Sequence, residues 1–161
     1  MTCFDTSILI WGIQGAAHPE QRGMVARTRR FLERLQETGE RVIVPAPVIA
    51  EYLSWFEPAK QARQRKILET RFRIPAFDTD AAALAAELGY DVEFLKQVRA
   101  EHKVQRQCLK FDIQIIAIAI LNGADCLITN EVDAFRKLAQ NRIQITEVPD
   151  VARQKRLGFE D

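Results

Sequence analysis

The chain opens with Cys3-Phe4-Asp5-Thr6-Ser7-Ile8-Leu9-Ile10-Trp11, an apolar run that holds a single carboxylate. A strand buried on both faces reads as a nearly continuous apolar run, so we expect a short strand at 2–4 that ends at Asp5. In open α/β sheets, ligands bind beyond the carboxyl ends of the strands. Asp5 is therefore expected at the edge of the sheet where such folds bind ligands. An Asx-turn or a helix N-cap made by Asp5 or Ser7 explains the same residues without a functional role.

Length and composition indicate one ordinary domain. The 161 residues suffice for a single core. The 23 Lys and Arg residues and the 22 Asp and Glu residues give a net charge of +1. The overall charge therefore does not indicate a nucleic-acid-binding protein. The longest apolar run, 115–121, is too short to span a bilayer, and no basic region precedes the N-terminal run, so we expect a cytoplasmic protein without a membrane segment. Three cysteines without C-x-x-C spacing predict reduced, buried thiols of a cytosolic protein: Cys3, Cys108 and Cys126.

Helical and strand-like patterns alternate along the whole chain. Apolar residues at helical spacing, with Pro at starts and Gly or Asn at ends, predict helices at about 19–38, 47–57, 58–70, 81–88, 111–121 and 131–140, and a helix followed by a loop within 91–110. Short apolar runs predict strands at 2–4, 41–45, 126–129 and 142–148, with 72–75 either a strand or merely extended, and we expect a loop at 12–15. This alternation predicts an α/β fold of three layers, α/β/α, around a mostly parallel central sheet.

Four carboxylates follow the carboxyl ends of these strands or lie near them. Asp5 follows the first strand, Glu51 lies on the helix after the second, and Glu131 follows the third. Asp112 lies in what we expect to be the first turn of a buried helix that packs back on the sheet. Because the carboxyl ends of parallel strands share one edge of the sheet, we expect the four carboxylates to lie close together. Singly, each has a structural explanation, namely a buried Arg partner for Glu51 and a helix dipole for Asp112 and Glu131.

Clustered carboxylates repel one another and take up protons unless a cation compensates. Oxygen ligands, with no His or Cys at metal spacing, suit Mg²⁺ or Mn²⁺ rather than Zn²⁺. Such ions are held by a few carboxylates plus water and substrate phosphate, so we expect a phosphate ester to be hydrolysed by a metal-activated water. Lys110 is a candidate contact for the scissile phosphate, or else a surface lysine. Four neighbouring side chains are candidates for hydrogen bonds to waters, carboxylates or a phosphate: Thr6, Ser7, Thr129 and Asn130.

In order and context, four segments resemble the acidic motifs of PIN domains. They are Phe4-Asp5-Thr6-Ser7-Ile8-Leu9, Val48-Ile49-Ala50-Glu51-Tyr52-Leu53, Asp112-Ile113-Gln114-Ile115-Ile116-Ala117-Ile118-Ala119, and Leu127-Ile128-Thr129-Asn130-Glu131 with Phe135. The likeness is greatest to the VapC-type toxins of bacterial and archaeal toxin–antitoxin pairs. It implies a Mg²⁺- or Mn²⁺-dependent endoribonuclease with a parallel sheet between helices, usually a homodimer and commonly neutralised by an antitoxin encoded beside it.

Carried over by position, the resemblance makes Asp5, Glu51 and Asp112 the three main catalytic and metal-binding acids. Glu131 stands where the family more often has Asp, and Asp133 is the alternative fourth acid. The stretch 89–110 is longer than a compact toxin of this kind needs, and it suits an RNA clamp, a dimer contact or an elaborated loop. We therefore expect one PIN-like domain over 1–161 that is elaborated at about 89–110.

The expected reaction is cleavage of single-stranded or loop RNA to leave a 3′-hydroxyl and a 5′-phosphate. The stretch 58–73 carries six basic residues against one acid, which suits RNA phosphates and equally a solvated helix face. One alternative is a catalytically weakened PIN-like module that binds RNA or a protein partner, for which Glu131 is the one hint. Another is an aspartyl-phosphate phosphatase or receiver domain, but those need a second Asp two residues on or an acidic pair, and Asp5-Thr6-Ser7 has neither.

Overall fold

Four short parallel strands form one sheet in the order β2-β1-β3-β4. In a computed structural model that describes residues 1–103 and 105–151, with the side chain of Arg106 left out, they are β1 (Thr2–Phe4), β2 (Val42–Ile43), β3 (Cys126–Ile128) and β4 (Gln144–Thr146). The predicted α/β fold with a parallel sheet is confirmed. The predicted domain extends to residue 161, and its last ten residues lie outside this description.

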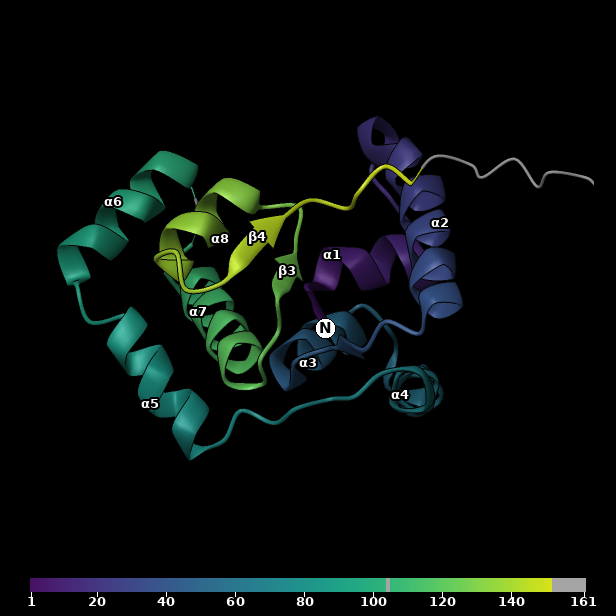
Figure 1. The fold of residues 1–161 in the computed structure, drawn as a ribbon, viewed down its shortest axis with the longest axis horizontal. Coiled ribbons are helices and arrows are strands. Elements are labelled where there is room, and N and C mark those ends of the chain that lie inside the picture. Colours follow the sequence, from purple (N-terminus) through teal and green to yellow (C-terminus); the bar gives the residue numbers. More distant parts are fainter. Residues whose placement is uncertain (104, 152–161) are drawn as a thin grey trace, which may run out of the picture.

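Helices lie on both faces of the sheet, which gives the expected three layers (Figure 1). Figure 1 shows α7 and α8 beside the sheet with α5 and α6 outside them, and α1 and α2 on the opposite side. The helices are α1 (Thr6–Leu9), α2 (Arg22–Thr38), α3 (Ala46–Ser54), α4 (Pro58–Arg71), α5 (Thr79–Leu88), α6 (Val92–His102), α7 (Arg106–Leu121) and α8 (Val132–Ala139). A π-helical turn, η1 (Ile10–Gln14), follows α1, and a 3₁₀ turn, η2 (Pro19–Gln21), precedes α2.

Helix α7 lies between the sheet and α5, and its segment 115–119 is buried around the whole circumference of the helix. Every residue from Ile115 to Ala119 is buried, and the helix packs against α3, α5, α6 and α8. A helix that is apolar all round belongs in the interior of a protein. Burial on all sides therefore explains how a run so rich in β-branched residues forms a helix.

The start of α7 differs from the prediction. The helix begins at Arg106, ahead of the apolar run that was predicted to open it. Leu109 is buried one turn before Ile113, so the polar segment already carries the buried face of the helix. Asp112 consequently lies in the second turn, and its prediction in the first turn was wrong. The helix dipole acts within the first turn, so it does not explain a carboxylate at this position.

The loop predicted at 12–15 was also wrong, because η1 continues α1 as far as Gln14. A Cβ on Gly12 would lie 2.5 Å from Cδ1 of Leu32, so α2 packs directly on the backbone here. Gly15 ends the turn with φ of 74°, a conformation that glycine adopts without strain. The glycines are therefore used for close packing and for termination of the turn.

The remaining predictions mostly differ at the ends of elements. The 72–75 stretch is extended and makes one isolated parallel bridge, between Ile43 and Arg73. All three cysteines are free thiols, but only Cys3 is buried, whereas Cys126 is half-buried and Cys108 is exposed in the polar first turn of α7. The prediction of three buried thiols was therefore wrong. In the part of the chain that the structure describes, no helix combines the length and apolar character needed to cross a membrane.

Candidate functional site

Asp5 ends the first strand and begins the first helix. Its backbone N–H donates to the carbonyl oxygen of Ile128 at 3.1 Å, which continues the pairing of β1 with β3 by one residue. The side chain is buried at 9% exposure. Its Oδ2 accepts a 2.7 Å hydrogen bond from the hydroxyl of Thr129, and the carboxylate also accepts from the backbone N–H of Thr6. Parallel strand pairing therefore brings the two strand ends to one carboxylate.

The pKa of Asp5 is raised to about 6. Burial is the largest cause, because it disfavours the charged carboxylate. The hydrogen bonds from Thr129 and Thr6 oppose this effect, while the charges of Glu51 and Glu131 add to it. The ionised form of Asp5 therefore depends on the hydrogen-bond donors around it.

Thr129 also orders the corner after β3. Its Oγ1 accepts a hydrogen bond from the backbone N–H of Glu131 at 3.1 Å while its hydroxyl donates to Asp5. Glu131 occupies the N-cap position of α8. One buried hydroxyl therefore fixes the side chain of Asp5 and the backbone of Glu131 together.

Glu51 reaches the same edge of the sheet from α3. Its Oε2 accepts a 2.5 Å hydrogen bond from the hydroxyl of Thr6, the first residue of α1. Glu51 is otherwise exposed to solvent. The hydrogen bond joins α3 to α1 beside Asp5, and no buried Arg partner accounts for Glu51 among the described residues.

Asp112 is the most strongly perturbed acid of the group. Its Oδ2 is buried and has no hydrogen-bond partner in the described part of the chain. Its pKa is raised to about 8, first by burial and then by the charges of Asp5, Glu131 and Glu51. A buried carboxylate oxygen without a donor is costly unless a proton or a cation compensates it.

The fold thus brings Asp5, Glu51, Asp112 and Glu131 close enough to raise the pKa of Asp5, of Asp112, or of both. Asp133 pairs with Arg136 of its own helix at 3.4 Å, and it is not among the charges that raise the pKa of Asp5 or of Asp112. Within residues 1–103 and 105–151, no group of three or more His, Cys, Asp or Glu side chains is already arranged to hold a metal ion. The donor set nevertheless fits a hard divalent cation, since all four are carboxylates and one buried oxygen is unpartnered.

The other candidate residues fall into two groups. Thr6 and Thr129 hydrogen-bond the carboxylates, and Ser7 lies 3.5 Å from Oδ2 of Asp5. Asn130 is exposed beside the site. Lys110 is about 200° around α7 from Asp112, and its side chain lines an apolar groove on another face of the helix. The structure therefore does not bring Lys110 to the carboxylates.

An open pocket beside Glu131 was not predicted. It has a volume of about 590 Å³ and is lined by residues of the α6–α7 corner and of the loop that leads into α8, among them His102, Cys108, Asn130 and Asp133. Nε2 of His102 is buried without a hydrogen-bond partner in the described residues. The sequence carries no local signal for this pocket, because its two walls come from separate segments that meet only through the early start of α7.

Comparisons with known proteins agree with this fold. A family model described as PIN domain matches residues 2–141, and no curated protein matches the sequence. Solved structures with the same fold include VapBC2 from Rickettsia felis bound to a DNA fragment from their promoter (18% identity, 91% of this chain and 97% of that chain covered, TM-score 0.59). DNA-bound VapBC from Salmonella typhimurium is also similar (17% identity, 92% of this chain and 98% of that chain covered, TM-score 0.60). So is VapBC-1 from nontypeable Haemophilus influenzae (13% identity, 91% of this chain and 96% of that chain covered, TM-score 0.56).

Proposed function

We propose, since this chain belongs to the PIN domain family, that it is a metal-dependent endoribonuclease and the toxin of a toxin–antitoxin pair. PIN domains are generally nucleases and typically use divalent metals. One observation carries the proposal. Asp5 and Asp112 lie at the carboxyl edge of the parallel sheet, each with its pKa raised by burial and by the other carboxylates, and Asp112 keeps a buried unpartnered oxygen. Ordinary packing gives no reason to collect such groups.

Asp5, Glu51, Asp112 and Glu131 are the proposed metal-binding and catalytic residues. When bound among them, Mg²⁺ or Mn²⁺ supplies positive charge that stabilises the ionised carboxylates and lowers the pKa of a coordinated water. Thr129 and the backbone N–H of Thr6 hold Asp5 in one orientation, and the hydroxyl of Thr6 holds Glu51. These positioning contacts keep the acids in place while RNA binds.

The proposed reaction is hydrolysis of an RNA phosphodiester. A water oxygen attacks phosphorus, the bond from phosphorus to O3′ breaks, and O3′ takes a proton, which leaves a 3′-hydroxyl and a 5′-phosphate. The pocket lined by His102, Asn130 and Glu131 is the proposed place for a nucleotide next to the cleaved bond, since it opens beside the carboxylates. Ser7 is a further candidate for binding there.

The proposed partners are RNA, a cognate antitoxin protein and a second copy of the chain in a homodimer. The proposal of an antitoxin partner is supported by the likeness in fold to three VapBC complexes. We also propose that the protein is cytoplasmic. We further propose one PIN-like domain over 1–161 in which the stretch 89–110, mostly α6 and its flanks, is an elaboration. It forms one wall of the pocket beside Glu131.

Cleavage of total RNA by the purified full chain tests the nuclease. The reactions contain Mg²⁺, Mn²⁺ or EDTA, and they compare the natural chain with Asp5→Asn and with Glu33→Gln, an exposed acid on α2. We expect cleavage that needs metal, is lost in Asp5→Asn and is unchanged in Glu33→Gln. Equal cleavage by the natural chain and Asp5→Asn would overturn the proposal. If RNA is bound but not cut with either metal, the chain is a binding module.

A further inference from the structure

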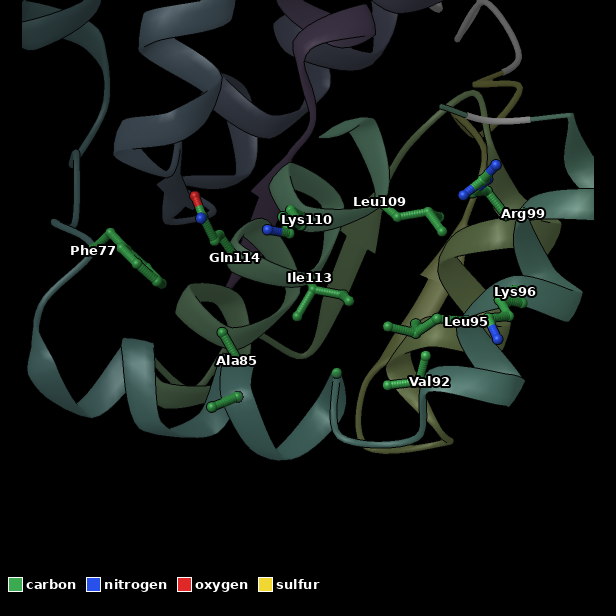
Figure 2. Close-up of a pocket in the computed structure, with 12 residues that line it drawn as sticks. Phe77, Ala85, Val92, Leu95, Lys96, Arg99, Leu109, Lys110, Ile113 and Gln114 are labelled. Carbon is green, nitrogen blue, oxygen red and sulfur yellow. The ribbon is translucent and has the colours of Figure 1, made fainter. Parts of the chain in front are cut away.

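A second site lies on the outer helical layer, on another face of α7 from Asp112. It is an apolar groove of about 420 Å³ between α5, α6 and α7 (Figure 2). Its walls are mostly aliphatic, with Leu95 from α6 and Leu109 and Ile113 from α7 facing Ala85 of α5. Gly89 forms part of the floor, where a Cβ would lie within 4 Å of Ile113 and Leu95. The missing side chain thus helps to keep the groove open.

Large apolar side chains are exposed at the rim of this groove. Phe77 is 38% exposed and Val92 is 59% exposed, and both line it. Tyr90, 85% exposed, lies in the short connection between the lining residues Gly89 and Val92. These three are half of the six large apolar residues that the described structure leaves exposed. Exposed apolar side chains that cluster on one surface indicate an interaction site, whereas scattered ones do not.

The charged residues that line the groove are all cationic. Figure 2 shows Lys96 and Arg99 at one end and Lys110 on α7 nearer to Phe77 at the other. No carboxylate lines the groove. Lys96 pairs with Glu93 at 2.6 Å, whereas Arg99 and Lys110 are in no ion pair with any described residue.

The cationic rim continues beyond the groove. A shallow hollow next to it is lined by Lys96, Arg99, Ala100 and Lys103. The strip of positive charge therefore follows α6 alongside the apolar floor. An occupant that satisfies both features has an apolar face and a carboxylate-rich face.

We propose that the groove between α5, α6 and α7 binds an acidic, amphipathic helix of a partner protein. Apolar side chains at i, i+3, i+4 and i+7 of such a helix fill the floor, and its carboxylates meet Arg99, Lys103 and Lys110. The charge complementarity steers association and fixes orientation. The proposal is independent of RNA cleavage, since the groove contains none of the four carboxylates.

Charge also argues against a second copy of this chain as the occupant. A two-fold dimer places the same patch on both subunits. Such a dimer through the groove would bring Arg99 and Lys110 of one copy near the same cations of the other. Like charges in an interface oppose binding, so a partner of opposite charge fits better.

Binding of a designed peptide to the full chain tests the proposal. The probe is a fluorescent helical peptide of about 14 residues, with leucines at i, i+3, i+4 and i+7 and glutamates on the other face. Its matched control replaces every glutamate by lysine. We expect anisotropy titrations to show saturable binding of the glutamate peptide only. The double variant Arg99→Glu/Lys110→Glu should weaken binding by roughly tenfold or more, and Ala86→Trp, which places a bulky ring on an exposed lining position, should block it.

Two control variants on α4 separate this groove from general basic attraction. Arg63→Glu/Lys66→Glu reverses two exposed cations, and Ala62→Trp adds a ring at an exposed alanine; both should leave peptide binding unchanged. Thermal melts check that every variant is folded. The proposal is overturned if the α4 pair weakens binding as much as the groove pair, if both peptides bind equally, or if the glutamate peptide does not bind. It is also overturned if Ala86→Trp only dissolves a dimer of the chain.

Discussion

The hydroxyl of Thr129 donates a 2.7 Å hydrogen bond to Oδ2 of Asp5, a residue 124 positions earlier in the sequence. The contact is buried, and it exists because β1 and β3 are parallel neighbours whose strands end side by side. A hydrogen bond to the ionised form of a carboxylate favours that form. The hydrogen bond from Thr129 therefore favours the ionised form of a buried acid, which is the form that we propose binds a cation.

Replacement of Thr129 by valine should weaken the site without removing an acid. Thr129→Val leaves Asp5 without its side-chain donor and Glu131 without the acceptor for its backbone N–H. Loss of such a positioning contact typically costs 10–100-fold in metal affinity or activity, and we expect a loss in that range in Mn²⁺ titrations and in RNA cleavage. Thr129→Ser retains the hydroxyl and should recover most of both. Equal loss in the serine and valine variants would contradict this role.

The metal-free chain should become less stable as pH rises. The pKa of Asp5 is about 6 and that of Asp112 about 8 in the folded state, against an ordinary value of 3.8. The folded state therefore binds more protons than the unfolded state between these values, so the free energy of unfolding falls as pH rises through this window. Thermal melts in EDTA should show a lower melting temperature at pH 8 than at pH 5.

A neutral replacement of Asp112 should weaken this pH dependence. Asp112→Asn removes the cost of ionising a buried carboxyl, so we expect it to stabilise the metal-free chain at pH 8 by about 1–3 kcal/mol. The gain should shrink towards pH 4, because the carboxyl of Asp112 is then protonated in the folded natural chain and partly protonated in the unfolded one. Glu33→Gln, on the exposed surface of α2, is the control and should change little. A stabilisation that does not depend on pH would rule out this cause.

The fourth acid should be Glu131 and not Asp133. Glu131 raises the pKa of both Asp5 and Asp112, whereas Asp133 pairs with Arg136 of its own helix. Glu131→Gln should weaken Mn²⁺ binding by about tenfold, in line with the loss of one supporting oxygen. Asp133→Asn should stay within about twofold of the natural chain. A larger loss of Mn²⁺ affinity in Asp133→Asn than in Glu131→Gln, measured by calorimetric titration, would instead identify Asp133 as the fourth acid.

We expect helix α4 to make a salt-dependent contact to RNA. Arg63, Lys66 and Arg71 are exposed and unpaired among the described residues, whereas Lys60 and Arg65 pair with acids of the same helix. Arg63→Glu/Lys66→Glu should weaken RNA binding by Asp5→Asn protein and lower the slope of log affinity against log salt by about 1–2. An unchanged slope in filter-binding titrations would indicate a solvated helix face that takes no part in binding.

The sheet and the approximate position of the acids were predictable from the sequence, because both follow from the alternation of elements. Short apolar runs placed β1 and β3, and parallel strands share an edge for their carboxyl ends. That rule was enough to predict that Asp5 and Glu131 lie close together. The sequence also made Thr129 a candidate for a hydrogen bond to a carboxylate, but it did not specify that the carboxylate is that of Asp5.

What the sequence missed depends on tertiary packing. The start of α7 at Arg106 was missed because Leu109 is the single buried residue in a polar segment, and a helix with so weak an apolar stripe gives little periodicity. The same error placed Asp112 in the first turn. Lys110 was a candidate phosphate contact because it precedes Asp112 by two residues, but on a helix that spacing points the two side chains to different faces. Residues 12–15 were read as a loop because Gly12 and Gly15 suggest one, whereas Gly12 allows close packing with α2 and Gly15 ends the π-helical turn.

We propose that Asp5, Glu51, Asp112 and Glu131 form one divalent-metal site. Mn²⁺ binding tests this proposal most directly. Calorimetric or electron paramagnetic resonance titrations at pH 7.5 should show saturable Mn²⁺ binding by the natural chain and by Glu33→Gln. Asp5→Asn and Asp112→Asn should each lose it while remaining folded in thermal melts. Unchanged Mn²⁺ affinity in both variants would contradict the account, because it would place the metal away from the edge of the sheet where Asp5 and Asp112 meet.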